Sequence, residues 1–361
     1  ENIKIVIYDP KKNMNKLPKK IKENKCWLNN INSKIYTFES YIKYNIIYIT
    51  EKLDLIETLL NNNIIKLLNY SDNSVYQLNE FINETYNDIS LRSLSKTKYE
   101  IKNIQKACNI VDNTFIHLWR NLNNIIKTGD MYKYISNYIQ NSEISSFAYP
   151  PIITQSSKIH PKFKDIKINK DKLVLIDLGC RYNGYCSDIT RTFSMKGYFN
   201  DIQTDMYTIV LDCFKYACSL LKPNVSFNKI NKKSLLFLKK KLLDYNLITN
   251  KSRADSLTME LMPHLIGHSV GLDVHDVSVD TKYDNNEWIL QTNNIVTIEP
   301  GIYFRKNLEK NIGINSKMYK NIYKHVKCIR IEDTIQITDS GYISLTNLPV
   351  EINEINNIIN I

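Results

Sequence analysis

Apolar residues recur at helical spacing in the segment KTKYEIKNIQKACNIVDNTFIHLWRNLNNII, which follows Ser95 and predicts a long amphipathic helix. Comparable patterns predict further helices at residues 130–140, 203–221 and 227–245. Runs rich in Val, Ile and Thr predict strands at residues 173–178, 185–193, 294–299 and 326–337. Because these elements follow one another without a regular βαβ order, the pattern favours an α+β fold.

The first 93 residues have a different character. They are rich in Asn and irregular, with one strand-like run, IKIVIYDP, and one helical pattern at residues 50–69. We therefore predict an N-terminal domain at residues 1–93 and a second domain at residues 94–361. The chain begins with Glu1 and carries no visible targeting segment, so we expect a fragment or a processed form.

Polar residues interrupt the predicted strands in VLIDLGCRYNGYCSDITRTF, residues 174–193. Asn183-Gly184 is a signal for a two-residue hairpin turn, because both turn positions need positive φ. That turn pairs Tyr182 with Tyr185 and sets Asp177 opposite Thr190.

In this register Asp177 and Asp188 are diagonal neighbours on one face, roughly 7 Å apart. Arg191 points to the opposite face, so it is a poor direct partner for either carboxylate. When two ionised carboxylates lie this close together, they need a shared proton, cationic side chains or a metal ion to offset their repulsion.

Later segments also place acidic residues within or at the end of predicted strands. Glu299 ends the strand-like run NNIVTIE, and Glu332 stands in the middle of VKCIRIEDTIQIT with Arg330 on the same face. Three histidines fall within PHLIGHSVGLDVHD, where Pro and Gly residues predict a shaped loop: His264, His268 and His275.

Two Asp, two Glu and one His offer eight carboxylate oxygens and one imidazole. That set suits two divalent metal ions about 3.5 Å apart. Hard oxygen donors favour Mn²⁺, with Co²⁺ or Fe²⁺ as alternatives. Such a pair delivers hydroxide at neutral pH and polarises a carbonyl group, which is the chemistry of amide hydrolysis.

Composition adds little to this picture. The chain has 361 residues and a net charge of +11, but its Lys residues are spread along the chain, so we expect no nucleic-acid partner. No apolar run reaches the roughly 18 residues that a membrane span needs. Seven Cys without a CxxC pair favour a reducing compartment.

The segments LVLIDLG, GYCSDITRTF, PHLIGHSVGLDVHD, TIEPGIYF and IRIEDTIQIT resemble, in this order, the signature of aminopeptidase P, a dinuclear metallopeptidase of the pita-bread fold. The resemblance covers about residues 92–355, and details of the loop and the C-terminal tail look closest to the bacterial and mitochondrial type. It implies release of an N-terminal residue that precedes proline, through a hydroxide that bridges two metal ions. The peptide substrate would therefore begin with Xaa-Pro.

The resemblance also implies metal-ligand roles for the matching residues. Asp188 and Glu332 would bridge both ions. Asp177 would complete the shell of one ion, and His268 and Glu299 that of the other.

Further roles concern the substrate. His275 would stabilise the scissile carbonyl, His264 would line the proline pocket, and His160, in KIHPKF, would line the site. Arg330 would steady the bridging glutamate and the substrate from outside the ligand set, and Glu299 would assist proton movement.

This sequence departs from the family in three places. The family's N-terminal domain is longer than residues 1–93, which implies a truncated α/β domain here. The loop before His160 is a few residues shorter, and the segment between Glu299 and Glu332 is several residues longer. We expect the resulting Lys/Asn-rich insert, residues 305–327, to be a solvated loop.

The alternatives within the same fold are a prolidase or a methionine aminopeptidase. An alternative of another class is a binding protein that keeps the pita-bread fold without catalysis. The resemblance is compatible with a homo-oligomer, and with a mitochondrial or a cytoplasmic location, of which it favours the mitochondrial.

Overall fold

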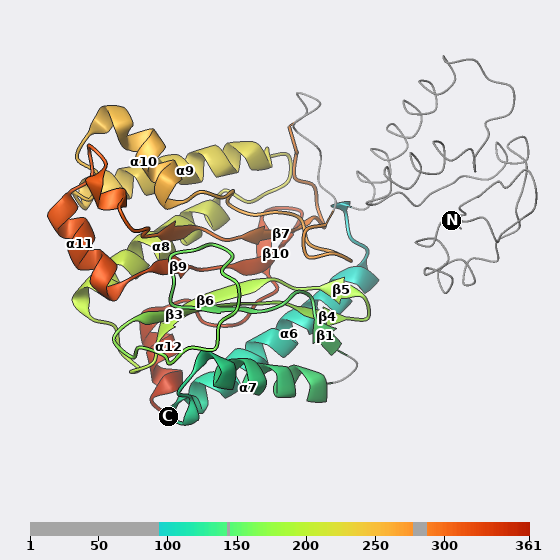
Figure 1. Cartoon of the computed structure of the whole chain (residues 1–361). Helices are drawn as coiled ribbons and strands as arrows, with labels where there is room; N and C mark the ends of the chain where they lie inside the picture. Colours follow the sequence, from blue (N-terminus) through green and yellow to red (C-terminus); the bar gives the residue numbers. More distant parts are fainter. Residues whose placement is uncertain (1–93, 143–144, 277–286) are drawn as a thin grey trace, which may run out of the picture. The chain divides into compact units, whose positions relative to one another are not determined.

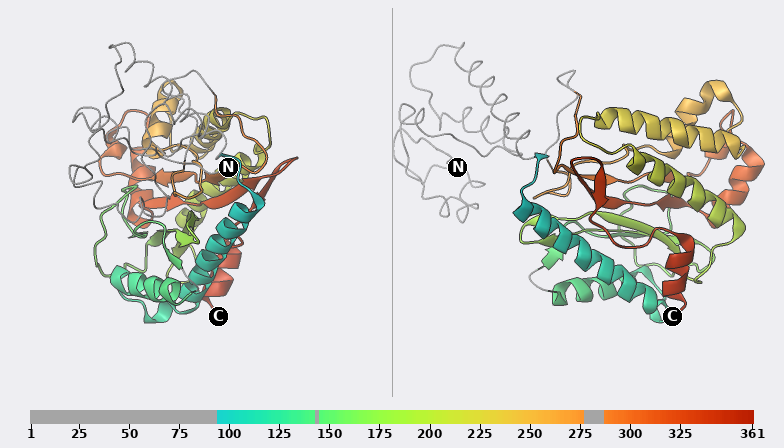
Figure 2. Two further views of the ribbon diagram at one scale, coloured as in Figure 1. Left: turned by 90° about the vertical axis from the view of Figure 1, so that its right-hand side faces the viewer. Right: turned by 180° about the vertical axis from the view of Figure 1, so that it is seen from behind.

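The computed structural model describes residues 94–142, 145–276 and 287–361. Ser93–Ile361 form one compact unit, in which short strands lie between two groups of helices (Figures 1 and 2). The predicted N-terminal domain, residues 1–93, falls outside the described residues and stays a prediction. Among the described helices, none is long and apolar enough to cross a membrane.

Helices form where the apolar spacing predicts them. The long helix α6 covers Lys98–Arg120, and it is followed in chain order by α7 (Thr128–Asn141), α8 (Asp201–Ser219), α9 (Phe227–Asp244), α10 (Ala254–Leu261) and α12 (Ile352–Ile359). A capping box starts α6, since the Thr97 hydroxyl accepts the backbone N–H of Glu100 and the Glu100 carboxylate accepts that of Thr97. The predicted apolar face of α6 is buried, with Ile104, Cys108 and Val111 fully inaccessible.

The insert at residues 305–327 is folded, so the expectation of a solvated loop was wrong. It contains a 3₁₀ turn, Leu308–Lys310, and helix α11, Ser316–His325. Tyr319 and Ile322 of α11 are buried, and the Tyr319 ring meets Phe304 edge to face at 5.5 Å. Tyr319 and Ile322 lie three positions apart and so share one face of the helix. The prediction missed this short apolar face because Lys and Asn dominate the composition of the insert.

The strands are short and pair antiparallel, in four small sheets among the described residues. One sheet has β3 (Leu173–Leu178) between β2 (Ile152–Thr154) and β6 (Ile189–Ser194). A second has β10 (Asp333–Ile337) between β7 (Ile295–Ile298) and β11 (Tyr342–Ser344). A third has β4 (Cys180–Tyr182) between β1 (Ser145–Phe147) and β5 (Tyr185–Cys186), and β8 (Gly301–Tyr303) pairs with β9 (Cys328–Arg330).

The predicted hairpin is confirmed. Asn183 and Gly184 have φ of 48° and 90°, Tyr182 pairs with Tyr185, and Asp177 pairs with Thr190. Cys180 and Cys186, which flank the turn, are buried free thiols.

The hairpin is not continuous, however, because Ser187 and Asp188 separate β5 from β6. The Ser187 hydroxyl accepts the backbone N–H of Cys180 at 3.1 Å, and the backbone N–H of Asp188 donates to the Thr334 hydroxyl at 3.0 Å. The hairpin register nevertheless continues, since the backbone N–H of Ser187 donates to the Cys180 carbonyl oxygen at 2.9 Å, and the bonds between Asp188 and Thr334 link this point to β10.

The strand predicted at residues 326–337 is assigned as two strands, β9 and β10, but Arg330 pairs with Gly301 and Asp333 with Ile298, so one register continues through Glu332. Glu332 stands in the gap between β9 and β10, where Thr190 and Glu332 form an isolated antiparallel bridge. This bridge joins the end of the hairpin to the β10 sheet. It brings the two halves of the predicted ligand set together.

Arg191 is buried on the face opposite the carboxylates, as its register predicts. Its guanidinium donates to Asp333 at 2.7 Å and to backbone carbonyl oxygens of four residues: Thr190, Glu332, Leu348 and Pro349. The Arg191 side chain thus connects β6, β10 and the segment before α12 through hydrogen bonds on the face opposite the carboxylates.

Arg191→Met is therefore expected to lower the free energy of unfolding by about 3 to 5 kcal/mol, because it leaves the buried Asp333 carboxylate without its partner. Urea denaturation measures this loss. Lys229→Met removes an exposed ion pair with Glu287 and serves as the matched control, which is expected to have little effect. Equal losses in the two variants would contradict the role of Arg191.

Candidate metal centre

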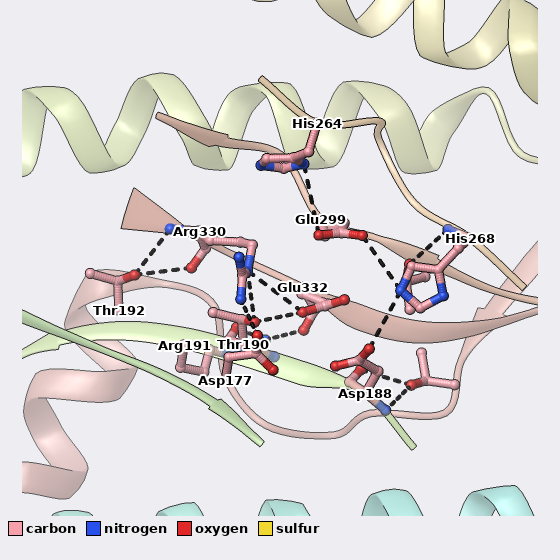
Figure 3. Close-up of polar contacts among 12 residues, drawn as sticks. Asp177, Asp188, Thr190, Arg191, Thr192, His264, His268, Glu299, Arg330 and Glu332 are labelled. Carbon is pink, nitrogen blue, oxygen red and sulfur yellow. Dashed lines mark hydrogen bonds and ion pairs between the residues drawn. The ribbon is translucent and has the colours of Figure 1, made fainter. Parts of the chain in front are cut away.

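The five predicted metal ligands converge from five chain segments (Figure 3). Asp177 lies in β3, Asp188 directly precedes β6, and Glu299 directly follows β7. Glu332 occupies the gap before β10, and His268 lies on the loop between α10 and β7. Strand ends and breaks position every carboxylate except Asp177.

The donor atoms form three overlapping groups, each with all its atoms within 4.8 Å of one another. The groups are Asp177 with Asp188 and Glu332, His268 with Glu299 and Glu332, and Asp188 with His268 and His275. Asp188, Glu332 and His268 each belong to two groups. Such sharing is what two adjacent cations require of bridging ligands.

His268 is oriented as a metal ligand. Its Nδ1 donates to the backbone oxygen of Ser269 at 3.0 Å, which leaves Nε2 facing Asp188 at 3.4 Å and Glu299 at 3.6 Å. A backbone carbonyl on the outer nitrogen is the usual way of fixing the tautomer of a ligand histidine.

The loop that carries His268 lies directly against β7. A Cβ on Gly267 would lie 2.0 Å from the backbone oxygen of Thr297, so only glycine allows this approach. The backbone N–H of Thr297 donates to the His268 carbonyl oxygen, and the Thr297 hydroxyl accepts the His268 N–H. The loop therefore has one fixed register against the strand.

Burial of so many acidic groups is electrostatically unfavourable. Burial and the neighbouring carboxylates raise the pKa of Glu332 well above its usual range. Burial raises the pKa of Asp177 to about 6, although Arg330 opposes the shift, and that of Glu299 to about 7, although His268 opposes it. Burial alone would lower the pKa of His268, but a hydrogen bond to Asp188 and the charge of Glu299 raise it to about 9.

This chemistry fits divalent cations. Cations remove the repulsion among the carboxylates and hold them ionised. The donor set of carboxylates and one imidazole, shared between adjacent groups, therefore suits two such ions.

Arg330 is the buried cation of the site. Its guanidinium contacts the Asp177 carboxylate, donates to the Tyr303 hydroxyl at 2.8 Å, and donates through Nε to the Thr190 hydroxyl at 3.0 Å. Thr190 in turn donates to Glu332 at 2.5 Å. Arg330 thus reaches Glu332 mainly through Thr190, since their direct separation is 3.8 Å.

Tyr149 is a site residue that the sequence patterns did not reveal. Its hydroxyl contacts Asp177 and lies 2.5 Å from an oxygen of Asp188. One hydroxyl hydrogen thus lies between two carboxylates, which reduces their repulsion. Tyr149 stands outside any strand, in the sequence FAYPP, and no local periodicity marks it.

The other predicted histidines surround the ligands. The His264 ring lies 3.8 Å from Glu299 and meets the Tyr303 ring at 5.4 Å between centroids. The exposed His275 ring lies 4.3 Å from that of His268. Burial, with the charge of a nearby Arg330 or His268, lowers the pKa of all three accessory histidines, His160, His264 and His275. They are therefore neutral at pH 7.

Residues 102–339 match the sequence profile of metallopeptidase family M24. The chain belongs to this family.

Curated M24 relatives are similar over part of their length. Intermediate cleaving peptidase 55 of Saccharomyces cerevisiae is 32% identical over 309 residues, which covers 82% of this chain and 55% of the relative. Xaa-Pro aminopeptidase 3 of Rattus norvegicus is 30% identical over 274 residues, with coverages of 73% and 51%. The mitochondrial intermediate cleaving peptidase 55 of Arabidopsis thaliana is 34% identical over 220 residues, with coverages of 59% and 40%. The chain spans about half the length of the curated relatives it matches.

A solved variant of Escherichia coli aminopeptidase P, in complex with substrate, has the same fold. Its TM-score is 0.64 at 26% identity, and the match covers 74% of this chain and 60% of that chain. The predicted pita-bread fold is therefore confirmed for this M24 chain.

The raised pKa values predict how the metal-free M24 domain responds to pH. Glu299, Asp177 and His268 have higher pKa values in the folded state than in the unfolded chain. The folded state therefore binds more protons, so the free energy of unfolding decreases as the pH rises. With chelator present, the melting temperature is expected to fall between about pH 5 and about pH 8. Added Mn²⁺ is expected to raise the melting temperature most at the high-pH end of this range.

Glu332→Gln is the matched variant, because it keeps a side chain of the same shape and removes one buried titrating group. Its metal-free melting temperature is expected to depend less on pH. A metal-free wild type that becomes more stable toward pH 8 would contradict the prediction.

Proposed function

We propose that this protein is a metal-dependent aminopeptidase that releases the N-terminal residue from peptides with proline at the second position. The overlapping donor groups that share Asp188, His268 and Glu332 carry this proposal. Family membership and the likeness to Escherichia coli aminopeptidase P support the choice of reaction.

Asp188 and Glu332 would be the bridging ligands, because each belongs to two donor groups and, unlike the His268 imidazole, a carboxylate has two oxygens to share between two ions. Asp177 completes one shell, and His268 with Glu299 completes the other. The chemistry supplied by two bound divalent ions is activation of a water and polarisation of a carbonyl group. Oxygen donors outnumber the single imidazole, which favours Mn²⁺, with Co²⁺ or Fe²⁺ as alternatives.

The remaining residues act on the peptide. His275 is neutral and exposed beside His268, so its ring N–H is free to donate to the scissile carbonyl oxygen. Glu299, whose second carboxylate oxygen faces His264, would also assist proton movement during bond cleavage. Arg330 holds Asp177 in place, as a positioning residue.

His264 and His160 are the proposed walls of the proline subsite. The Nε2 atom of His264 is buried and has no hydrogen-bond partner among the described residues. His160 shares a pocket with Tyr303, whose ring meets His264. Neutral imidazole rings beside an aromatic ring suit an apolar pyrrolidine.

The relatives named as intermediate cleaving peptidase favour a mitochondrial location over a cytoplasmic one for this chain. A homo-oligomer stays a prediction.

The reaction is tested by mass spectrometry with Mn²⁺ and a mixture of Xaa-Pro-Pro-Xaa, Xaa-Pro and Met-Ala-Ser peptides. Loss of one residue from the first peptide alone, abolished by chelator, is the expected result. Cleavage of the dipeptide alone would indicate a prolidase, and of the Met peptide alone a methionine aminopeptidase. Metal binding without any cleavage would favour a binding protein.

Asp188→Ala is expected to abolish turnover and to lower metal content in parallel, because one bridging ligand serves both ions. Activity and metal stoichiometry are measured on the same preparation. Asp273→Ala, which removes an exposed carboxylate of the same loop region as His275, is the control. Turnover of Asp188→Ala with two bound metals would contradict the assignment.

His275→Ala is expected to keep both metals and to lower kcat by the equivalent of about 2 to 4 kcal/mol of transition-state stabilisation. Steady-state kinetics at saturating metal measure the loss. His117→Ala removes a ring that stacks on Tyr134 of α7, away from the centre, and serves as the control. Equal kinetics for His275→Ala and wild type would remove the proposed role.

A further inference from the structure

A pocket of about 480 Å³ extends the proposed proline subsite, since His160 and Tyr303 are among the residues that line it. Residues 157–160 form one wall, and Pro263, Tyr303 and Arg305 form the rest. These residues come from three separate segments, which are the loop between β2 and β3, the start of the histidine-rich loop, and the end of β8.

The pocket is directly connected to the metal centre. The Tyr303 hydroxyl accepts a hydrogen bond from Arg330, and Arg330 contacts the ligand Asp177. The Tyr303 ring also meets His264. His160, a proposed wall of the proline subsite, also lines the pocket, so a residue next to the proline can reach it.

Its charge is distinctive. Lys158 and Arg305 contribute two cations, His160 is neutral at pH 7, and none of the described residues that line the pocket is acidic. No described carboxylate forms an ion pair with Lys158 or Arg305.

Arg305 has unused hydrogen-bonding capacity. It donates from one terminal nitrogen to the backbone oxygen of Glu260 at 2.7 Å, while the Glu260 carboxylate accepts from Asn311 at 2.9 Å. A guanidinium has five N–H donors in a planar fork that matches a carboxylate. Arg305 and Lys158 are both exposed residues, and both line the pocket.

We propose that this pocket binds an acidic side chain of the peptide, at the position before or after the proline. Ile159, Pro263 and Tyr303 provide an apolar wall for the methylene groups, and Arg305 with Lys158 binds the carboxylate. The inference rests on the proposed aminopeptidase function and adds the class of peptide that the enzyme prefers.

The test measures kcat/KM for C-terminally amidated Xaa-Pro-Xaa-Ala-Ala peptides, so that no terminal carboxylate competes. Peptides with Glu or Gln are compared at position one and, separately, at position three. A preference for Glu of about tenfold at one of the two positions is expected, and it should decrease at high salt. That position identifies the residue that occupies the pocket.

Arg305→Gln and Lys158→Gln are each expected to reduce the ratio of Glu to Gln rates several-fold, and Arg305→Glu to favour Lys at the same position. Lys162→Gln, an exposed lysine of the same loop that does not line the pocket, is expected to keep the wild-type ratio. Thermal melting of each variant shows that it is folded.

The outcomes separate the two proposals. Equal rates for Glu and Gln peptides at both positions, with clear cleavage of each, would overturn the acidic pocket and leave the aminopeptidase function standing. A Glu preference that survives both Arg305→Gln and Lys158→Gln would also overturn it. Failure to cleave any Xaa-Pro peptide would instead reject the proposed function.

Discussion

The structure depends on placing four carboxylates close together. Asp177, Asp188 and Glu332 are buried and Glu299 is partly buried, so these groups repel each other, and the raised pKa values of three of the four record that cost. Arg330 and the Tyr149 hydroxyl reduce the repulsion within the chain. Divalent cations are the natural partners for the charge that remains.

The fold meets this constraint by joining short strands from different sheets. Asp188 and Glu332 lie between assigned strands whose registers continue, and the bridge between Thr190 and Glu332 joins the two segments. Arg191 secures this junction from the opposite face, and Gly267 lets the histidine loop lie on β7. Stability and ligand geometry are therefore products of the same contacts.

The surroundings of the centre divide into a neutral part and a cationic part. The three accessory histidines are neutral at pH 7, which suits an uncharged peptide bond and a proline ring. Beyond Tyr303, Lys158 and Arg305 make the adjoining pocket basic. Arg305 belongs to the start of the insert whose helix α11 packs into the domain through Tyr319, so the insert contributes one lining residue to this pocket.

Local patterns in the sequence determined the long helices and the Asn183-Gly184 hairpin with its register, because periodicity and turn chemistry act over neighbouring residues. The motifs that resemble aminopeptidase P marked the five proposed metal ligands. Only the tertiary structure decided that Thr190 and Glu332 form a bridge between two strand segments, that Arg330 pairs with Asp177, and that Tyr149 bridges two carboxylates. It also decided that the insert folds as a helix. Each of these features depends on contacts between residues far apart in the chain, and no local period encodes them.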